Sequence, residues 1–414
     1  MSYEFFISQR YLYSMQKSGY ISLITLFSIG GILVGVAALI ITLGIMNGFE
    51  TEVRSRIIGF DAHIRLFDFD KEPGLANYPE LISEIKQIDR IKGCAPFISE
   101  ICIIRSEKPK TIVLKGVNLE AEAEVSKIKE YLVAGEFNFG EVPFEGDIPR
   151  PGILLGRGIA DRLVVDIWDK VRLISPVGLS ITGGPVQEPA TRQFRVTGIF
   201  ESGLSEYDSK IAYIGIEEAQ DFLKYGGNIG GIEIKLDDYE DAQFVADKII
   251  KKLGPSYTTE TWLERNKTLF SSMQLEKWGA FIVLSLIILV AAFNIISTLI
   301  MMVLEKNIEI GILKAMGASS KSIMKIFLFH GLIVGVIGTT FGSILGYLAC
   351  WSQIKFQWFS LPSDLYFIKA LPVELQFVDF ISITLASLLI SILASIYPAW
   401  KASRLEPVEA IRYE

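Results

Sequence analysis

Four long stretches of this chain contain no Asp, Glu, Lys or Arg, and they constrain its fold more than any other feature. They cover residues 21–49, 279–304, 326–352 and 380–400. A helix needs roughly 20 consecutive apolar residues to cross the hydrocarbon core of a bilayer, and each stretch reaches that length. The sequence therefore predicts an α-helical membrane protein with four transmembrane helices.

The spacing of these stretches predicts a large inserted domain. Residues 50–278 separate the first two stretches, whereas short connections join the last three. Half of all residues are apolar and 21% are charged, which fits a membrane part combined with a water-soluble part. The first apolar run is longer than the 7–15 residues of a signal-peptide core, so we expect a retained anchor.

Basic residues near the ends of the spans indicate the orientation. Nine Lys and Arg residues lie in the N-terminal segment, the link between the second and third spans and the tail, against only Lys355 and Lys369 in the last link. Basic residues favour the cytoplasmic side, so both termini are expected in the cytoplasm and the large domain outside. That domain has 29 basic and 38 acidic residues, and its net charge of −9 argues against nucleic-acid binding.

These observations give a complete division of the chain. From the N-terminus, we expect a cytoplasmic interfacial helix at 1–20, the first span at 21–49, the outer domain at 50–277, the second span at 278–304, a cytoplasmic helix at 305–322, the third span at 323–352, an outer loop at 353–377, the fourth span at 378–400 and a cytoplasmic tail at 401–414.

Hydrophobic periodicity predicts mixed α/β structure in the outer domain. Strands are expected at 62–67, 101–105, 111–117, 171–175, 193–198 and 231–236, and helices at 79–88, 158–163, 216–224 and 239–253. Residues 134–156 are rich in Pro and Gly, and we interpret them as a crossing between subdomains. Cys94 and Cys102 could form a disulfide or remain two reduced, partly buried thiols.

The chain lacks the residues that several classes of activity need. The spans carry no ionisable groups of the kind that line ion-coupled transporters and proton pumps. The two histidines, His63 and His330, have no metal-ligand spacing to the cysteines, and no nucleophile motif surrounds His63. We expect His330 to be a packed side chain. The dipeptide Gly-Lys is absent, so the chain has no phosphate-binding loop of the ATPase type.

Small and polar residues in the spans indicate close helix packing. Gly331, Gly335, Gly338, Gly342 and Gly346 follow one face of the third span, and Ser387, Ser391 and Ser395 follow one face of the fourth. Such stripes let helix backbones approach in lipid, either within one chain or across a dimer interface, and both alternatives stay open. The cluster of Asn294, Ser297 and Thr298 favours an interhelical hydrogen bond over a substrate contact.

The cytoplasmic link between the second and third spans predicts a short amphipathic helix. Ile308, Ile312 and Met316 fall on one face, with Glu309 near the start and Lys314 near the end, as the helix dipole favours. Such a helix is suited to fit a groove in a soluble partner and to carry its motion into the bilayer. A simple turn on the membrane surface is the alternative.

Three segments resemble a known family. Residues 308–318 resemble the coupling helix of the MacB/FtsX superfamily of ABC permeases, and residues 397–414 resemble its C-terminal signature. The run from Phe5 to His63 is similar to the lipoprotein-releasing permeases of the LolC/LolE type. The resemblance implies a MacB-like periplasmic domain with two subdomains. It also implies an ATPase-coupling site formed by Glu309, Gly311, Ile312, Lys314, Met316 and Gly317.

The resemblance implies two further sites. A long loop with three prolines matches the position of the hook that binds a periplasmic lipoprotein carrier, with Pro176, Pro185, Gln187 and Arg192 as contacts; a plain flexible loop is the alternative. A groove for the lipid anchor would be bordered by Met46, Phe49, Phe270, Met273, Trp278 and Phe281. Ordinary lipid-facing packing is an equally good account of each of these residues singly.

The expected function is that of a non-catalytic permease subunit in an ATP-driven lipoprotein-releasing complex of the bacterial inner membrane. The resemblance implies a cytoplasmic ABC ATPase that binds ATP and Mg, a second permease protomer, identical or related, a periplasmic carrier and acylated lipoprotein cargo. No cofactor is expected in this chain. The alternatives are a MacB-like efflux permease with a separate ATPase and an FtsX-like regulator of external hydrolases, although the latter would be expected to have a much smaller outer domain.

Overall fold

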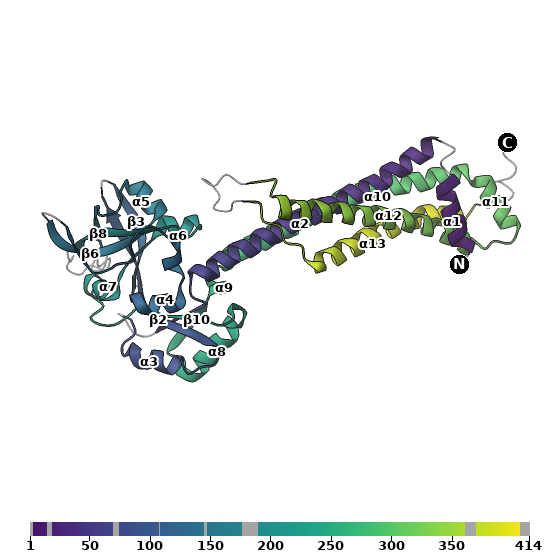
Figure 1. The fold of residues 1–414 in the computed structure, drawn as a ribbon. Coiled ribbons are helices and arrows are strands. Elements are labelled where there is room, and N and C mark those ends of the chain that lie inside the picture. The colour runs from purple at the N-terminus through teal and green to yellow at the C-terminus, as the bar shows by residue number, and fades with distance from the viewer. Residues whose placement is uncertain are drawn as a thin grey trace, which may run out of the picture. The chain divides into compact units, whose positions relative to one another are not determined.

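The computed structural model describes residues 3–14, 19–68, 74–106, 108–144, 147–175, 189–360 and 370–405 (Figure 1). The chain divides into two compact units. The first, here called the helical unit, comprises Met1–Thr51, Ser271–Ser363 and Ile368–Glu414. The second, here called the sheet unit, comprises Glu52–Phe270 with Asp364–Phe367.

Four helices have the length and apolar composition to cross a membrane, as the sequence predicts. They are α2 (Gly19–Phe60), α10 (Lys267–Glu305), α12 (Ser320–Phe356) and α13 (Phe377–Ser403). Each is longer than its uncharged stretch, because a helix continues through polar residues once its backbone hydrogen bonds are formed. Two shorter helices complete the helical unit, α1 (Tyr3–Ser14) and α11 (Asn307–Ala315).

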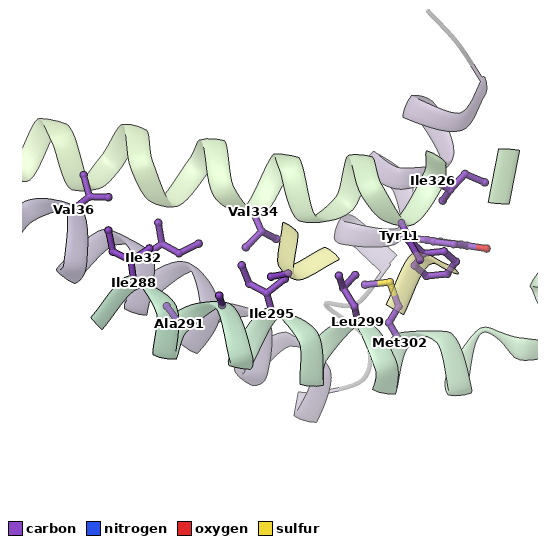
Figure 2. Close-up of a cluster of buried hydrophobic side chains, with 14 of the residues drawn as sticks. Tyr11, Ile32, Val36, Ile288, Ala291, Ile295, Leu299, Met302, Ile326 and Val334 are labelled. Carbon is purple, nitrogen blue, oxygen red and sulfur yellow. The ribbon is translucent and has the colours of Figure 1, made fainter. Parts of the chain in front are cut away.

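The helical unit has one continuous apolar core. Figure 2 shows side chains of α2, α10 and α12 that interdigitate along this core, with Tyr11 of α1 at one end. Ile32, Val36 and Leu299 are at most 1% exposed. Outside the core, α1 packs on α12 through an edge-to-face contact between Phe5 and Phe329, whose ring centroids are 5.9 Å apart.

The glycine stripe of α12 lies inside this bundle. A Cβ atom on Gly335 would lie 2.7 Å from Cβ of Ser391 in α13, and one on Gly342 would lie 2.7 Å from the carbonyl oxygen of Leu33 in α2. Both approaches are closer than real Cβ contacts, so these positions require glycine. Of the two alternatives for the stripe, the structure supports packing within one chain.

The predicted polar cluster of α10 is only partly an interhelical contact. The hydroxyl of Thr298 lies 3.2 Å from that of Ser28 in α2, and both residues are buried. Asn294 and Ser297, by contrast, are exposed in the single chain. His330 is buried in α12, as predicted.

The sheet unit is built on an eleven-stranded mixed sheet with the order β11-β1-β10-β2-β3-β9-β6-β8-β4; β5 pairs with β6, and β7 pairs with β2 and β8. The strands are β1 (Ile64–Asp68), β2 (Ile91–Arg105), β3 (Pro109–Val117), β4 (Leu132–Gly135), β5 (Glu141–Phe144), β6 (Asp147–Gly156), β7 (Lys170–Ile174), β8 (Thr191–Phe200), β9 (Ile211–Gly215), β10 (Gly231–Leu236) and β11 (Tyr257–Thr261).

Short helices cover this sheet. They are α3 (Tyr78–Ile85), α4 (Leu119–Val125), α5 (Arg157–Leu163), α6 (Ser205–Lys210), α7 (Ile216–Phe222), α8 (Ala242–Leu253) and α9 (Trp262–Arg265). Within the sheet unit, α3 lies beside β2 and α8 beside β11, whereas α5 and α6 lie beside β6 and α7 beside β3 (Figure 1). All six predicted strands and all four predicted helices of this unit are present, with shifted ends. The predicted two subdomains remain a prediction.

Residues 134–156, interpreted as a crossing between subdomains, contain two strands, because this passage supplies β5 and all of β6. The prolines do not prevent β6 from joining the sheet. β6 pairs with β8 over Gly152 to Gly156, beyond its prolines, whereas Pro151 is opposite Glu141 of β5. A proline is tolerated where the strand needs no donor on that side.

Cys94 and Cys102 are free thiols in this structure. Both lie on β2, eight positions apart, and a strand rises about 3.3 Å per residue. Their Cα atoms are therefore far beyond the roughly 7 Å limit for a disulfide. Burial raises the pKa of each thiol to about 12. The alternative of two reduced, buried thiols is the correct one.

Candidate functional site

The predicted cytoplasmic helix exists as α11, and it presents an apolar face. Ile308 is 51% exposed, Ile312 48% and Met316, just beyond the helix, 80%. These residues are four positions apart, so they fall on one side of the helix. Ile310 and Gly311 are buried on the other side. Gly317 adopts a positive φ of 98° and ends the segment before α12.

Charged residues of α11 hold it against other helices of its unit. The ammonium group of Lys314 donates to the backbone oxygens of Ser403 and Leu405, each at 2.7 Å, at the end of α13. At the other end, Glu309 forms an ion pair with Lys306 at 2.5 Å. Burial, the negative charge of Glu309 and a hydrogen bond to it raise the pKa of Tyr11 in α1.

The two predicted coupling residues Glu309 and Lys314 therefore act as clamps between α11 and its neighbours. The exposed surface comes from Ile308, Ile312 and Met316. A cavity of about 490 Å³ opens between α1 and α11, lined by Phe6, Ile7, Arg10, Tyr11, Lys306, Glu309, Ile312 and Leu313. Sequence reasoning missed this cavity, because half of its lining comes from a helix some 300 residues away in the chain.

The predicted hook falls mostly on residues that the structure does not describe. Pro176, Pro185 and Gln187 lie outside the described residues. The two ends of the loop are joined: the backbone N–H of Ser175 donates to the oxygen of Ala190 at 2.9 Å, and β7 pairs with β8 beside them. Residues 176–188 therefore connect two antiparallel strands that pair with each other.

Arg192, the fourth predicted hook residue, lies at the start of β8. Its guanidinium forms ion pairs with Glu218 at 2.9 Å and Asp221 at 2.8 Å, both in α7. Arg192 thus fixes the base of the loop to a neighbouring helix. Two carboxylates of α7 already share the charge of Arg192, so its role in this structure is to hold β8 to α7.

A basic cavity of about 320 Å³ lies close to the base of this loop. It is lined by Arg105, Ser106, Lys170, Val171, Arg172 and Gln193. Arg172 of β7 is opposite Arg105 of β2 and Gln193 of β8 in the strand pairing. Sequence reasoning missed this site, because the strand register, and not sequence proximity, brings its cations together.

The six residues predicted for the lipid-anchor groove are divided between the two units, and the groove stays a prediction. Phe270 belongs to the sheet unit, where it is 6% exposed and packs edge-on against Trp262 at 5.5 Å between ring centroids. The other five residues, Met46, Phe49, Met273, Trp278 and Phe281, belong to the helical unit. Among them Phe49 is 39% and Trp278 66% exposed, so these two offer apolar surface.

A polar contact that sequence reasoning missed lies in the same part of the helical unit. The amide of Asn47 in α2 accepts a hydrogen bond from Lys277 of α10 at 2.6 Å and donates one to Asp379 of α13 at 2.5 Å. Asn47 is 1% exposed. One buried amide therefore connects three of the four long helices.

Neither a metal site nor a catalytic histidine emerges in the described part of the chain. Among the described residues, no group of three or more His, Cys, Asp or Glu side chains could hold a metal ion. Nδ1 of His63 accepts a hydrogen bond from the backbone N–H of Leu236 at 3.2 Å. Burial, aided by the nearby charge of Lys235, lowers the pKa of His63 to about 3, so this ring is neutral and structural.

Two family profiles match the chain in sequence. The MacB-like periplasmic core domain family matches residues 25–252, and the FtsX-like permease C-terminal family matches residues 281–407. Together they cover most of the long helices and most of the sheet unit.

Full-length relatives give a narrower match. The "Lipoprotein-releasing system transmembrane protein LolC" of Xylella fastidiosa strain Temecula1 is 33% identical, over 99% of this chain and 98% of the relative. The LolC protein of Neisseria meningitidis serogroup B is 32% identical over the whole of both chains. The LolE protein of Haemophilus influenzae is 33% identical over 99% of both.

Proposed function

Because the chain belongs to the LolC/LolE family of lipoprotein-releasing permeases, we propose that it extracts acylated lipoproteins from the outer leaflet of the bacterial inner membrane by relaying the motion of a partner ATPase. The family membership establishes a multi-pass permease of lipoprotein transport with a periplasmic domain. The full-length relatives favour release over the efflux and regulator alternatives. The ATPase, the relay and the carrier are the proposed parts.

The observation that carries the relay is the combination of exposure and clamping at α11. Its apolar face, Ile308, Ile312 and Met316, is open, and such an amphipathic helix fits a groove in a partner. On the rest of the helix, Lys314 binds the end of α13 and Glu309 contacts Tyr11 of α1. A push on the open face is therefore passed to two other helices. ATP and Mg²⁺ are bound by the ATPase, and this chain needs no cofactor.

The chemistry of the cargo explains why external work is required. Each buried CH₂ group holds a lipid anchor in the membrane by about 0.8 kcal/mol, so several acyl chains do not leave spontaneously. Extraction from the outer leaflet needs no polar pore across the bilayer. The core of the helical unit is accordingly apolar and closely packed. A second permease protomer, identical or related, provides the other half of the extraction site.

Handover to a periplasmic carrier is assigned to the loop between β7 and β8. Its two ends are held together, with Ser175 bonded to Ala190 beside the paired strands β7 and β8. The basic cavity around Arg105, Lys170 and Arg172 adds a positive surface beside that base. Complementary charge speeds and orients protein association, so the carrier surface that binds here should be acidic.

Substitution of the most exposed α11 residue tests the proposal. Met316→Asp places a charge in the proposed apolar contact and should weaken recovery of the ATPase with the detergent-purified chain by about tenfold. Ile148→Asp is the matched control, since Ile148 is also exposed, at 74%, but lies in the sheet unit. Mass spectrometry of the purified material identifies the partners. Undiminished ATPase recovery with Met316→Asp, or no ATPase with the unaltered chain, would contradict the proposal.

A further inference from the structure

A network of charged side chains is buried where the sheet unit receives α2 and gives rise to α10. Asp61 follows directly after Phe60, the last residue of α2, and Arg265 lies two residues before Lys267, the first residue of α10. The guanidinium of Arg265 contacts the Asp61 carboxylate at 2.5 Å. One ion pair therefore joins the end of one long helix to the beginning of another.

The Asp61 carboxylate is fully occupied by donors. Besides Arg265, it accepts hydrogen bonds from Arg65 at 3.1 Å, from the hydroxyl of Tyr207 at 3.3 Å and from the backbone N–H of Ala62 at 2.9 Å. Asp61 is only 4% exposed. Burial alone would raise the pKa of Asp61, but the charges of Arg65 and Arg265 outweigh it and hold the pKa well below its usual range.

From Asp61 the network continues into the sheet. Arg65 of β1 contacts Glu233 of β10 at 3.0 Å, and Glu233 contacts Lys115 of β3 at 2.8 Å. Lys115 also lies 3.3 Å from Glu122 of α4. The side chains of Glu122 and Glu233 are 0% exposed and that of Lys115 is 6% exposed. The ion pairs thus run from the two helix ends to strands in the middle of the sheet.

Further contacts hold the same helix ends. Phe60 is buried in the sheet-unit core, with its ring 5.0 Å from that of Tyr207. The ammonium group of Lys235 in β10 donates to the backbone oxygens of Ile58 and Asp61, at the C-terminal end of α2. On the α10 side, the backbone N–H of Trp262 donates to the oxygen of His63 at 2.8 Å.

The energetics of buried charges favour a positioning role over simple stabilisation. Replacing a buried ion pair with apolar residues is often neutral or stabilising, whereas removing one partner is costly. We propose that Asp61 is a positioning residue for lipoprotein release: within the sheet unit, it fixes the C-terminal end of α2 and the segment that leads into α10 to the sheet, so that a shift of either helix end moves the sheet. This inference rests on the proposed function and adds the element that relays motion outside the membrane.

The test compares ATP use with release in vesicles that contain the full chain and its partner ATPase. Asp61→Asn keeps the shape of the side chain but removes its charge. Release of a fluorescent triacylated lipoprotein per ATP hydrolysed should fall about tenfold or more, while ATP hydrolysis changes less than about twofold. Lys86→Gln is the control, since Lys86 and Glu124 form an ion pair in the same unit with both side chains nearly half exposed. It should leave the ratio unchanged.

Two further variants separate positioning from folding. Arg265→Lys keeps the charge and should retain most of the release that Arg265→Gln loses. Tyr207→Phe removes one hydrogen bond to Asp61 and should lower release per ATP about threefold without changing the melting temperature. An unchanged ratio in Asp61→Asn and Tyr207→Phe would overturn the inference, as would equal losses of hydrolysis and release with a lower melting temperature. Unaltered protein that hydrolyses ATP without releasing lipoprotein would instead overturn the proposed function, and the inference with it.

Discussion

The helical unit and the sheet unit bury polar groups in opposite ways. In the helical unit, most of the buried polar contacts described here join hydroxyls to each other or to a carbonyl of the same helix, as Thr339 does with Ser387 and Ser395 does with Ser391. In the sheet unit, the buried contacts include full charges, among them Asp61, Glu233 and Lys115.

The difference follows from the surroundings of each unit and indicates what each can do. In lipid, the hydrophobic effect does not drive helices together. The association of helices in the helical unit therefore depends on close packing, with glycines where two backbones meet. The sheet unit obtains its stability from its apolar core and can use ion pairs to fix geometry. We therefore expect substitutions in the two units to have different costs.

The largest effect is expected from Lys115→Met. It leaves Glu233 and Glu122 without their shared cation in the interior of the sheet unit, and loss of one partner of a buried pair costs about 3–5 kcal/mol. Urea unfolding of the purified chain in detergent, followed by tryptophan fluorescence, measures the loss. Lys86→Met, at an exposed pair, should cost at most about 1 kcal/mol. Equal costs for the two variants would show that the buried network is not special.

A smaller effect is expected from Gly342→Ala in the helical unit. The new methyl group would lie 2.7 Å from the backbone oxygen of Leu33, and overpacking of this kind costs about 1–3 kcal/mol. Gly30→Ala is the control, because nothing lies within 4 Å of the added atom. Thermal melting in detergent should show a lower midpoint for Gly342→Ala alone. A matching decrease in both variants would mean that helix contact at Gly342 is looser than described.

The charged network also predicts a dependence on pH. Burial raises the pKa of Glu122 to about 7, despite the opposing charge of Lys115. The folded state then keeps a proton that the unfolded chain has lost above its ordinary pKa, so stability falls as the pH rises from about 5 to about 7. Glu122→Gln cannot lose a proton and should flatten this slope by about 1 kcal/mol per pH unit. Unfolding midpoints at both pH values check the prediction, and parallel slopes would refute it.

The smallest effect is expected for a single hydrogen bond in the helical unit. Thr339 and Ser387 are buried, with their hydroxyl oxygens 2.8 Å apart. A double-mutant cycle with Thr339→Val and Ser387→Ala should give a coupling energy near 0.6 kcal/mol, the average for such bonds in membranes. A value as large as that of a buried ion pair would remove the contrast between the units.

Elements with a strong local signal could be predicted from the sequence. Charge-free stretches located the four spans, and alternating or helical patterns located most strands and helices of the sheet unit. Helix ends were less predictable: α2 continues to Phe60, through charged residues that carry no membrane signal. β6 was missed because its prolines lie in its first half, where it pairs with β5, whereas its pairing with β8 begins beyond them.

Contacts between distant residues could not be predicted. Asp61 and Arg265 are 204 positions apart, and nothing near either residue indicates that they meet. Arg192 could be assigned to the loop, but its ion pairs with α7 depend on the strand register. Phe270 was assigned to the groove because it lies shortly before the uncharged stretch of the second span. Its ring is instead buried against Trp262. The apolar face of α11 was predictable because it depends only on helical spacing.

The most direct test of the account is a release measurement on the unaltered protein. Vesicles that contain the chain, its ATPase and a fluorescent triacylated lipoprotein also enclose a small polar dye, and an acyl-binding carrier is supplied outside. We predict that ATP hydrolysis drives transfer of the lipoprotein to the soluble carrier while the dye stays inside. A non-hydrolysable ATP analogue should not support transfer. Lipoprotein release without ATP hydrolysis, or escape of the dye together with the lipoprotein, would contradict it.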